Sequence, residues 1–344
     1  MPDITLGASG ITVNRLGFGA LPLQRLGMSE AVALLRAAAD NGVTFFDTAR
    51  LYTDSEEKIG AALAERRERL VIATKTMATD REGMEADLAA SLKALRTGYI
   101  DLYQVHNAKS LPRPGGEVYD TLMDMKGRGA IRAVGLTAHS LPVALEAAAS
   151  GLYATVQYPF SLLADDRELE LVRLCRENGV GFIAMKGLAG GLITDIAAAH
   201  AFMAAQPGVL PIWGMQSEEE LNEFLRLEAA PPAFDGAMRA RIAAEQEALA
   251  GQFCRGCGYC QPCPQGIAIQ YVARMKRLLR RSPWQQYAGK DWADRMEAAR
   301  SCIQCGECAE RCPYGLDAPS LIQENLADYD AFMAERGIVP GGGA

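Results

Sequence analysis

Four side chains with complementary proton chemistry lie at or near the ends of short apolar runs in the first third of the sequence. They are Asp47 in VTFFDTA, Tyr52 five residues later, Lys75 in LVIATKT and His106 at the end of IDLYQVH. A lysine that pairs with a carboxylate and lies close to a phenol stabilises the phenolate, so the hydroxyl becomes a usable acid near neutral pH. If the fold brings the four residues together, they form a site that can protonate a carbonyl oxygen.

Each of these residues also has an ordinary structural explanation. Asp47 can cap a turn, Tyr52 can be a half-buried loop aromatic, Lys75 can lie at a solvated strand end, and His106 can be a hydrogen-bonded core histidine. The combination of all four at the ends of successive apolar runs favours a catalytic site.

Eight of the nine cysteines form two closely spaced quartets between residues 254 and 312. The second quartet has the spacing C-x2-C-x2-C-x3-C-P of bacterial ferredoxins, in which three thiolates bind one [4Fe–4S] cluster and the cysteine before proline binds the other. The first quartet is one residue shorter before its last cysteine and also ends in Cys-Pro. We therefore predict two [4Fe–4S] clusters with the ligands Cys254, Cys257, Cys260, Cys263, Cys302, Cys305, Cys308 and Cys312.

Ferredoxin-like ligation would interleave the quartets, so that Cys312 completes the first cluster site and Cys263 the second. Zinc and disulfides are the alternatives. Zinc sites usually join two separated CxxC pairs, and a reducing cytoplasm disfavours disulfides. The ninth cysteine, Cys175, occupies an apolar helix position and is predicted to lie in the core.

The composition is typical of a globular protein. The 344 residues are 49% hydrophobic and 22% charged, with a net charge of −7, which argues against a disordered chain and against a nucleic-acid partner. The first ten residues lack the basic and apolar regions of a signal peptide, and the long uncharged stretches contain Pro, Gly, Gln or His. We therefore expect a cytoplasmic protein that does not enter a membrane.

Short apolar runs alternate with helix-like stretches over the first 230 residues, and there are eight of them: RLGFG, VTFFDTA, LVIATKT, IDLYQVH, IRAVGLTA, ATVQYPF, GFIAMKG and VLPIWGM. This α/β pattern predicts a (β/α)8 TIM barrel with its active site in the loops after the strands. A doubly wound open sheet is the alternative. It is disfavoured because no GxGxxG follows the first run, whereas Gly187, Gly190 and Gly191 follow the seventh, where barrels commonly bind phosphate. The opening ITLGASGITV predicts a hairpin that closes the barrel's bottom.

The abrupt rise in cysteine content near Ala250 predicts a second domain. We assign residues 1–230 to the barrel, 231–250 to a connector, 251–335 to a small, mostly helical ferredoxin-like domain and 336–344 to a tail. Residues 264–301 carry eight Lys or Arg against three Asp or Glu. This basic segment is either a solvated helical face, a source of positive charge near the clusters, or a dock for an acidic electron carrier such as ferredoxin or flavodoxin.

The motifs FFDTARLY, SEEKIG, ATKT, DLYQVH and VQYPF resemble those of the aldo-keto reductase family over roughly residues 1–230. By this resemblance Tyr52 would be the general acid, Lys75 and Asp47 its tuning pair, and His106 would orient the carbonyl. The protein would be an oxidoreductase that reduces an aldehyde or ketone, or oxidises an alcohol, by hydride transfer with NADP or NAD. The resemblance also implies cofactor contacts from Thr137, Ala138, His139, Gln157, Met185, Leu188, Gly190, Gly191, Gly214, Gln216, Ser217 and Glu220.

Two positions depart from the family pattern. Met185 replaces the tyrosine that stacks on the nicotinamide in most members, which leaves a softer thioether contact. The last loop reads GMQSEEELNE, and its three successive glutamates would repel a 2′-phosphate, although Ser217 and Glu220 also form a helix capping box. The choice between NADP and NAD stays open.

A different class of function is the alternative. The protein would then be an iron–sulfur electron-transfer or redox-sensing protein in which the barrel is a non-catalytic binding scaffold.

Overall fold

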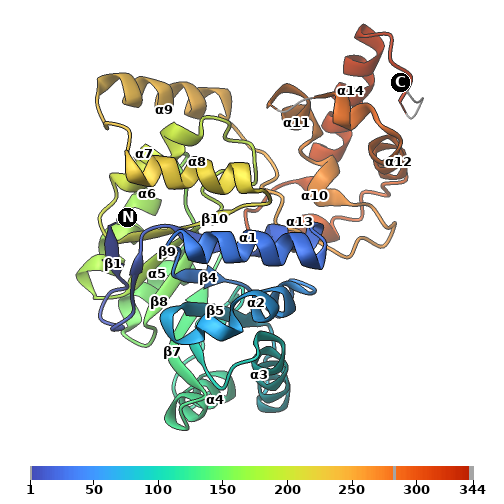
Figure 1. Cartoon of the computed structure of the whole chain (residues 1–344). Helices are drawn as coiled ribbons and strands as arrows, with labels where there is room; N and C mark the ends of the chain where they lie inside the picture. The colour runs from blue at the N-terminus through green and yellow to red at the C-terminus, as the bar shows by residue number, and fades with distance from the viewer. Residues whose placement is uncertain (1, 282–283, 341–344) are drawn as a thin grey trace. The chain divides into compact units, whose positions relative to one another are not determined.

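Eight parallel strands form a closed barrel in the computed structural model, which describes residues 2–281 and 284–340 (Figure 1). The strands neighbour one another in the order β10-β3-β4-β5-β6-β7-β8-β9. This closure confirms the predicted (β/α)8 barrel and excludes the open sheet. Their bounds are β3 (Gly17–Gly19), β4 (Phe45–Asp47), β5 (Val71–Thr76), β6 (Ile100–Val105), β7 (Ile131–Thr137), β8 (Thr155–Pro159), β9 (Gly181–Met185) and β10 (Val209–Gly214).

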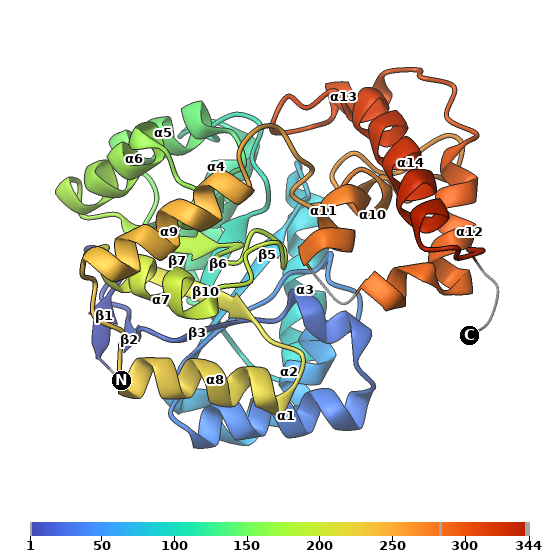
Figure 2. The same ribbon diagram turned by 90° about the horizontal axis from the view of Figure 1, so that it is seen from above.

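Helices follow the strands along the chain and surround the barrel, as the view from above shows (Figure 2). They are α1 (Met28–Asp40), α2 (Ser55–Leu63), α3 (Arg81–Leu95), α4 (Glu117–Gly127), α5 (Leu141–Ser150), α6 (Asp166–Glu177), α7 (Ile196–Ala204) and α8 (Glu218–Ala229). Side-chain caps begin several of them: Asp80 accepts a hydrogen bond from Gly83 N, and Asp165 accepts from Glu168 N. Parallel strands joined in this way present all their carboxyl ends on one face of the barrel.

The N-terminal segment forms the predicted antiparallel hairpin, β1 (Asp3–Thr5) with β2 (Thr12–Asn14). Two apolar side chains of this segment, Leu6 and Val13, belong to the same buried cluster as the barrel residues Phe45, Leu102 and Leu210. The hairpin therefore covers apolar surface inside the barrel.

The predicted core cysteine, Cys175, is buried in α6, and burial raises the pKa of its thiol to about 12.

The cysteine-rich region is mostly helical, as predicted. Its helices are α10 (Ile269–Val272), α11 (Met275–Arg281), η3 (Trp284–Ala288), α12 (Lys290–Ala299), α13 (Glu307–Glu310) and α14 (Ala318–Glu335). The long helix α14 packs against α10 and α11 and buries Ile322, Leu326 and Tyr329, and the Tyr329 hydroxyl donates to Tyr287 O at 3.1 Å. This small core gives the cysteine loops a fixed framework.

The chain's contacts divide it into two units. One comprises Met1–Gly187 with Ala197–Ala243, and the other comprises Leu188–Ile196 with Ala244–Ala344. The division falls inside helix α9 (Gly236–Ala248), within the segment that we predicted as a connector. The short segment after β9 therefore belongs with the cysteine-rich unit, although its sequence position placed it in the predicted barrel.

Two arginines hold that short segment inside the second unit. Arg274 Nη2 donates to Gly190 O at 2.7 Å, and Arg281 Nε donates to Leu192 O at 2.6 Å.

No helix in the described ranges combines the length and apolar character needed to cross a membrane.

Candidate active site and cysteine cavities

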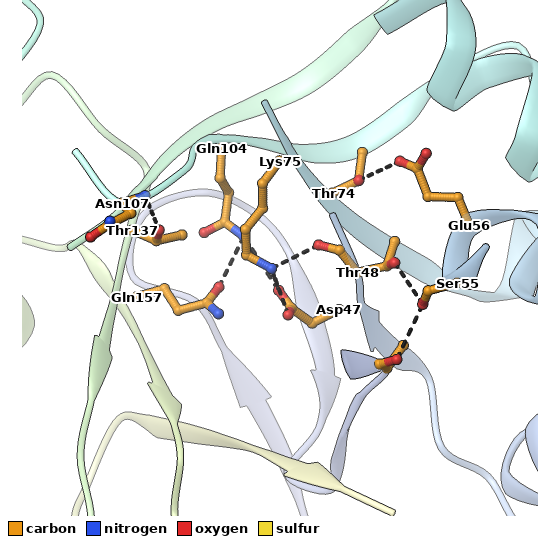
Figure 3. Close-up of polar contacts among 11 residues, drawn as sticks. Asp47, Thr48, Ser55, Glu56, Thr74, Lys75, Gln104, Asn107, Thr137 and Gln157 are labelled. Carbon is orange, nitrogen blue, oxygen red and sulfur yellow. Dashed lines mark hydrogen bonds and ion pairs between the residues drawn. The ribbon is translucent and has the colours of Figure 1, made fainter. Parts of the chain in front are cut away.

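Lys75 and Asp47 form a buried ion pair at the ends of neighbouring strands β5 and β4. Lys75 Nζ lies 2.7 and 2.6 Å from the two carboxylate oxygens of Asp47 and also donates to Thr48 O at 2.7 Å (Figure 3). Burial lowers the pKa of Lys75 and raises that of Asp47, and the ion pair opposes both shifts. The pair therefore holds a fixed cation at the carboxyl ends of the strands.

Tyr52 and His106 lie beside this cation. Lys75 Nζ is 5.3 Å from the centroid of the Tyr52 ring, and the rings of Tyr52 and His106 meet edge to face with centroids 5.8 Å apart. The structure thus brings the four predicted catalytic residues together. Burial, with the nearby charge of Lys75, lowers the pKa of His106 to about 3, so its imidazole is neutral at physiological pH.

Buried polar residues of α2 fix the loop that carries Tyr52. Thr48 Oγ1 donates to Ser55 Oγ at 2.9 Å, and Ser55 Oγ donates to Ala20 O at 3.2 Å. Lys58 Nζ donates to Leu23 O and Leu26 O, each at 2.9 Å. The motif SEEKIG therefore has a structural role, because its buried polar groups hold the β4–α2 loop in place.

Gln104 is a site residue that the sequence analysis missed. Its Nε2 donates to Gln157 Oε1 at 2.9 Å and lies 3.4 Å from Asp47 Oδ1 (Figure 3), and both glutamines are buried. A signal was present in DLYQVH, because Gln104 precedes His106 by two residues and alternate residues of a strand face the same side.

The ends of β7, β8 and β9 carry the residues predicted to surround the nicotinamide. Thr137 Oγ1 accepts from Asn107 N at 2.7 Å (Figure 3). His139 Nδ1 lies 3.1 Å from Asn107 Oδ1. Asn107, also missed from the sequence, thereby joins the β6 end to the β7 end. Gln157, Met185, Ala138 and His139 are all buried, and burial lowers the pKa of His139, as does the charge of Lys186.

The last barrel loop gathers the second group of predicted cofactor residues. Gly214 ends β10, Gln216 N donates to Glu220 Oε2 at 2.7 Å, and Ser217 Oγ accepts from Glu220 N at 3.3 Å. The predicted capping box is therefore formed on one side only, because the Glu220 carboxylate bonds Gln216 N. Arg25, from η1 (Leu21–Arg25), donates to Gln216 Oε1 at 3.1 Å and brings a positive charge to this acidic loop.

The remaining predicted phosphate-binding residues, Leu188, Gly190 and Gly191, lie in the segment counted with the second unit. Gly190 and Gly191 have φ angles of 69° and 86°, a region that favours glycine. Their contact with a cofactor stays a prediction.

Two cavities in the second unit gather the cysteines in interleaved sets. One is lined by Cys254, Cys257, Cys260 and Cys312, and the other by Cys263, Cys302, Cys305 and Cys308. Cys308 also borders the first cavity. Each quartet thus contributes three cysteines to one cavity and its Cys-Pro cysteine to the other.

The spacing of these thiols fits a cluster better than a single ion. In the described part of the chain, no three His, Cys, Asp or Glu side chains are close enough together to hold one metal ion, and all nine cysteines are free thiols. Zinc needs four donors about 2 Å from one point. A [4Fe–4S] cluster instead takes one thiolate on each of four irons, so its ligands surround a larger body.

Comparison with known proteins agrees with both halves of this description. The model of the aldo/keto reductase family matches residues 15–198, and a 4Fe–4S dicluster domain matches residues 253–317. Aldo-keto reductase YhdN of Bacillus subtilis is 30% identical over 56% of this chain and 64% of its own length. Probable aldo-keto reductase 1 of Glycine max is 31% identical over 55% of this chain and 60% of its own length. The chain therefore spans less than two thirds of these relatives.

A solved aldo/keto reductase from Klebsiella pneumoniae, in complex with NADP and acetate, has the same fold. It superposes with a TM-score of 0.60 at 24% identity and covers 70% of this chain and 94% of its own. The barrel, its matched family model and the cysteine cavities lead to one conclusion: the chain belongs to the aldo/keto reductase family and carries a C-terminal 4Fe–4S dicluster domain.

Proposed function

We propose that the barrel catalyses reduction of an aldehyde or ketone, or the reverse oxidation of an alcohol, with a nicotinamide cofactor. The observation that carries this proposal is the buried Lys75–Asp47 pair beside Tyr52, with the neutral imidazole of His106 against the same phenol ring. The nicotinamide, when bound, supplies a hydride to the carbonyl carbon. The chain's own residues manage the proton and the developing negative charge.

Tyr52 is the proposed proton donor. Transfer of its hydroxyl proton to the substrate oxygen leaves a phenolate, which the Lys75 ammonium stabilises from 5.3 Å away, measured to the ring centroid. Asp47 keeps Lys75 protonated in a buried position, where an unpaired ammonium would lose its proton. Neutral His106 contributes an N–H that orients the carbonyl oxygen toward Tyr52.

The residues at the strand ends fit a nicotinamide ring and its ribose. Gln157 offers a side-chain amide whose orientation Gln104 fixes, and Thr137, His139 and Met185 line the adjacent strand ends. In the last loop, Gln216 and Ser217 offer polar groups to the adenosine end. Arg25 favours a 2′-phosphate there and Glu218–Glu220 oppose it, so we propose a nicotinamide cofactor without assigning NADP over NAD.

We propose further that the two cysteine cavities bind two [4Fe–4S] clusters, with Cys254, Cys257, Cys260 and Cys312 holding one and Cys263, Cys302, Cys305 and Cys308 the other. Such clusters transfer single electrons, whereas a hydride carries two. We therefore assign the clusters to electron exchange with a protein carrier and the barrel to hydride transfer.

Turnover measured on anaerobically purified protein tests the barrel's function. Oxidation of NADPH and of NADH is followed with a panel of aldehydes and ketones, and binding is followed by quenching of Trp213, which is buried in β10. Carbonyl-dependent oxidation supports the proposal. Nucleotide binding without turnover on any carbonyl would instead support a non-catalytic barrel that serves the electron-transfer domain.

A further inference from the structure

The basic segment at residues 264–301 divides into two regions of different charge. Around α11, the side chains of Arg274, Lys276, Arg277, Arg280 and Arg281 line one open pocket with a volume of about 430 Å³, which we call the α11 pocket. Around α12, Lys290 pairs with Asp294, and Arg300 pairs with Glu297 and Asp330. The excess positive charge is therefore concentrated at α11.

Two cations of the α11 pocket form no ion pair with the carboxylates of the described residues, although one carboxylate, Glu324, also lines the pocket. Arg280 bonds both carboxylate oxygens of Asp328, at 2.6 and 2.8 Å, and Arg281 pairs with Glu245. No carboxylate of residues 2–281 or 284–340 lies within ion-pair distance of Lys276 or Arg277, whose guanidinium donates only to the carbonyls of Ala248 and Ala250. Burial and the charge of Arg281 lower the pKa of Arg277, as expected for crowded like charges.

The α11 pocket shares a lining residue with a cysteine cavity. Phe253 lines the pocket and directly precedes Cys254, and Leu321 lines both the pocket and the cavity of Cys254, Cys257, Cys260 and Cys312. The Arg277 guanidinium lies 4.7 Å from the centroid of the Phe253 ring. A partner bound at the pocket is thus close to the predicted cluster, which favours electron transfer.

A hydrogen bond between α11 and α14 fixes one wall of the pocket. Asn325, buried in α14, accepts from Lys276 N at 2.7 Å and donates to Leu321 O at 2.7 Å. Because the bond from Lys276 N to Asn325 joins the first turn of α11 to α14, the exposed ammonium of Lys276 extends from an anchored backbone. The backbone of this wall is therefore ordered before a partner binds.

We propose that the α11 pocket is the docking surface for the acidic face of a one-electron carrier protein. The proposal rests on cluster binding in the proposed function. Carboxylates of the carrier would pair with Lys276 and Arg277, which matters because the chain as a whole, at −7, repels an acidic protein. One electron then passes between carrier and cluster, so that one is oxidised as the other is reduced, and no bond is made or broken.

Stopped-flow reduction of the cluster-loaded full chain by reduced flavodoxin, an acidic carrier, tests this surface. For Lys276→Glu we expect the second-order rate constant at low ionic strength to fall about tenfold, with a flatter salt dependence. The matched control is Lys290→Glu, the same charge change on an exposed lysine of the same unit, and we expect its rate constant to stay within about twofold of the wild type. Reduced methyl viologen, a small cation, provides the carrier-independent rate.

An equal fall in the rate constant for Lys276→Glu and Lys290→Glu would overturn the docking surface, because the net charge of the chain alone would then control association. An unchanged rate constant for Lys276→Glu would also overturn the docking surface. Inhibition by millimolar inorganic phosphate, without a change in how the rate constant depends on salt, would overturn it as well, because the pocket would then be a small-anion site. Failure of methyl viologen to reduce the wild type, together with iron analysis, would identify a failure of cluster binding instead.

Discussion

Gln104 Nε2 lies 2.9 Å from Gln157 Oε1 in the interior of the barrel, so one strand-borne amide sets the orientation of another. Replacing Gln104 with leucine removes this bond and leaves the Gln157 amide with Asp47 as its side-chain partner. We expect the dissociation constant for the nicotinamide cofactor to rise roughly fivefold, the value of one hydrogen bond of about 1 kcal/mol. Quenching of Trp213 fluorescence by the cofactor measures this dissociation constant. Unchanged binding in Gln104→Leu would show that Gln157 needs no such support.

Removal of the Tyr52 hydroxyl should separate binding from chemistry. Tyr52→Phe keeps the ring against His106 and lacks only the transferable proton, so we expect kcat to fall by roughly 10²- to 10⁴-fold while cofactor affinity stays within about twofold. Steady-state kinetics and Trp213 quenching on the same preparation give both quantities. Retained turnover would remove Tyr52 from its proposed role.

Lys75→Met should affect both stability and the pH profile. It leaves Asp47 buried without its cation, which costs about 3–5 kcal/mol in the free energy of unfolding unless the carboxyl takes up a proton. The double variant Asp47→Asn/Lys75→Met restores a neutral pair and should recover most of that loss. In any active preparation, the pH dependence of kcat should move toward the ordinary tyrosine range near ~10; an unmoved profile in the double variant would count against the tuning role.

Mild acid should destabilise the barrel through its buried histidines. Burial lowers the pKa of His106 to about 3, so its imidazole is neutral in the folded state at pH 5–7, and burial also lowers the pKa of His139 well below its ordinary value. The unfolded chain takes up protons near pH ~6.5, and each histidine therefore removes up to about 1.4 kcal/mol of unfolding free energy per pH unit below that value.

Denaturant titrations at pH 7, 6 and 5, followed by Trp213 fluorescence, measure this slope. His106→Gln should reduce it by about half relative to the wild type. A slope that is identical in the variant would assign the acid sensitivity to other groups.

The interleaved arrangement of cysteines makes a non-additive prediction for iron content. The wild type should hold about eight irons and eight acid-labile sulfides per chain. Cys263→Ser and Cys302→Ser line one cavity, so their combination should remove about four irons, no more than either alone. Cys263→Ser with Cys257→Ser affects both cavities and should remove nearly all. The opposite order of losses would mean that each quartet binds its own cluster, and stoichiometric zinc would replace the cluster assignment.

The barrel was predictable because its signals are local. Apolar runs such as LVIATKT and IDLYQVH alternate with helical stretches, and residues at strand ends must meet on one face once the strands are parallel. Asp47, Lys75 and His106 therefore come together in the structure as expected. The interleaving of the cysteines was also predictable, because the Cys-Pro spacing at Cys312 is particular to two-cluster ferredoxins.

Features that depend on distant partners were not predictable. Gln104 bonds Gln157 across 53 positions, and Arg25 bonds Gln216 across 191 positions, and neither pair forms a local motif. Dependence on distant partners also explains why the charge distribution of the basic segment at residues 264–301 was not predictable. Its eight cations look alike in sequence, and only folding shows that Lys290 and Arg300 have acidic partners whereas Lys276 and Arg277 have none in the described part of the chain.

The hydrogen bonds that tie Leu188–Ile196 to Arg274 and Arg281 have a consequence for gene fusion and domain exchange. The cysteine-rich unit is discontinuous in sequence, because it includes the nine residues Leu188–Ile196 that follow β9. In a chimaera that keeps only the residues before 243, the Gly190 and Leu192 carbonyls would lose their arginine hydrogen-bond donors. The cysteine-rich unit is therefore not confined to the C-terminal part of the chain, and its transfer to another protein must include Leu188–Ile196 as well as the residues after 243.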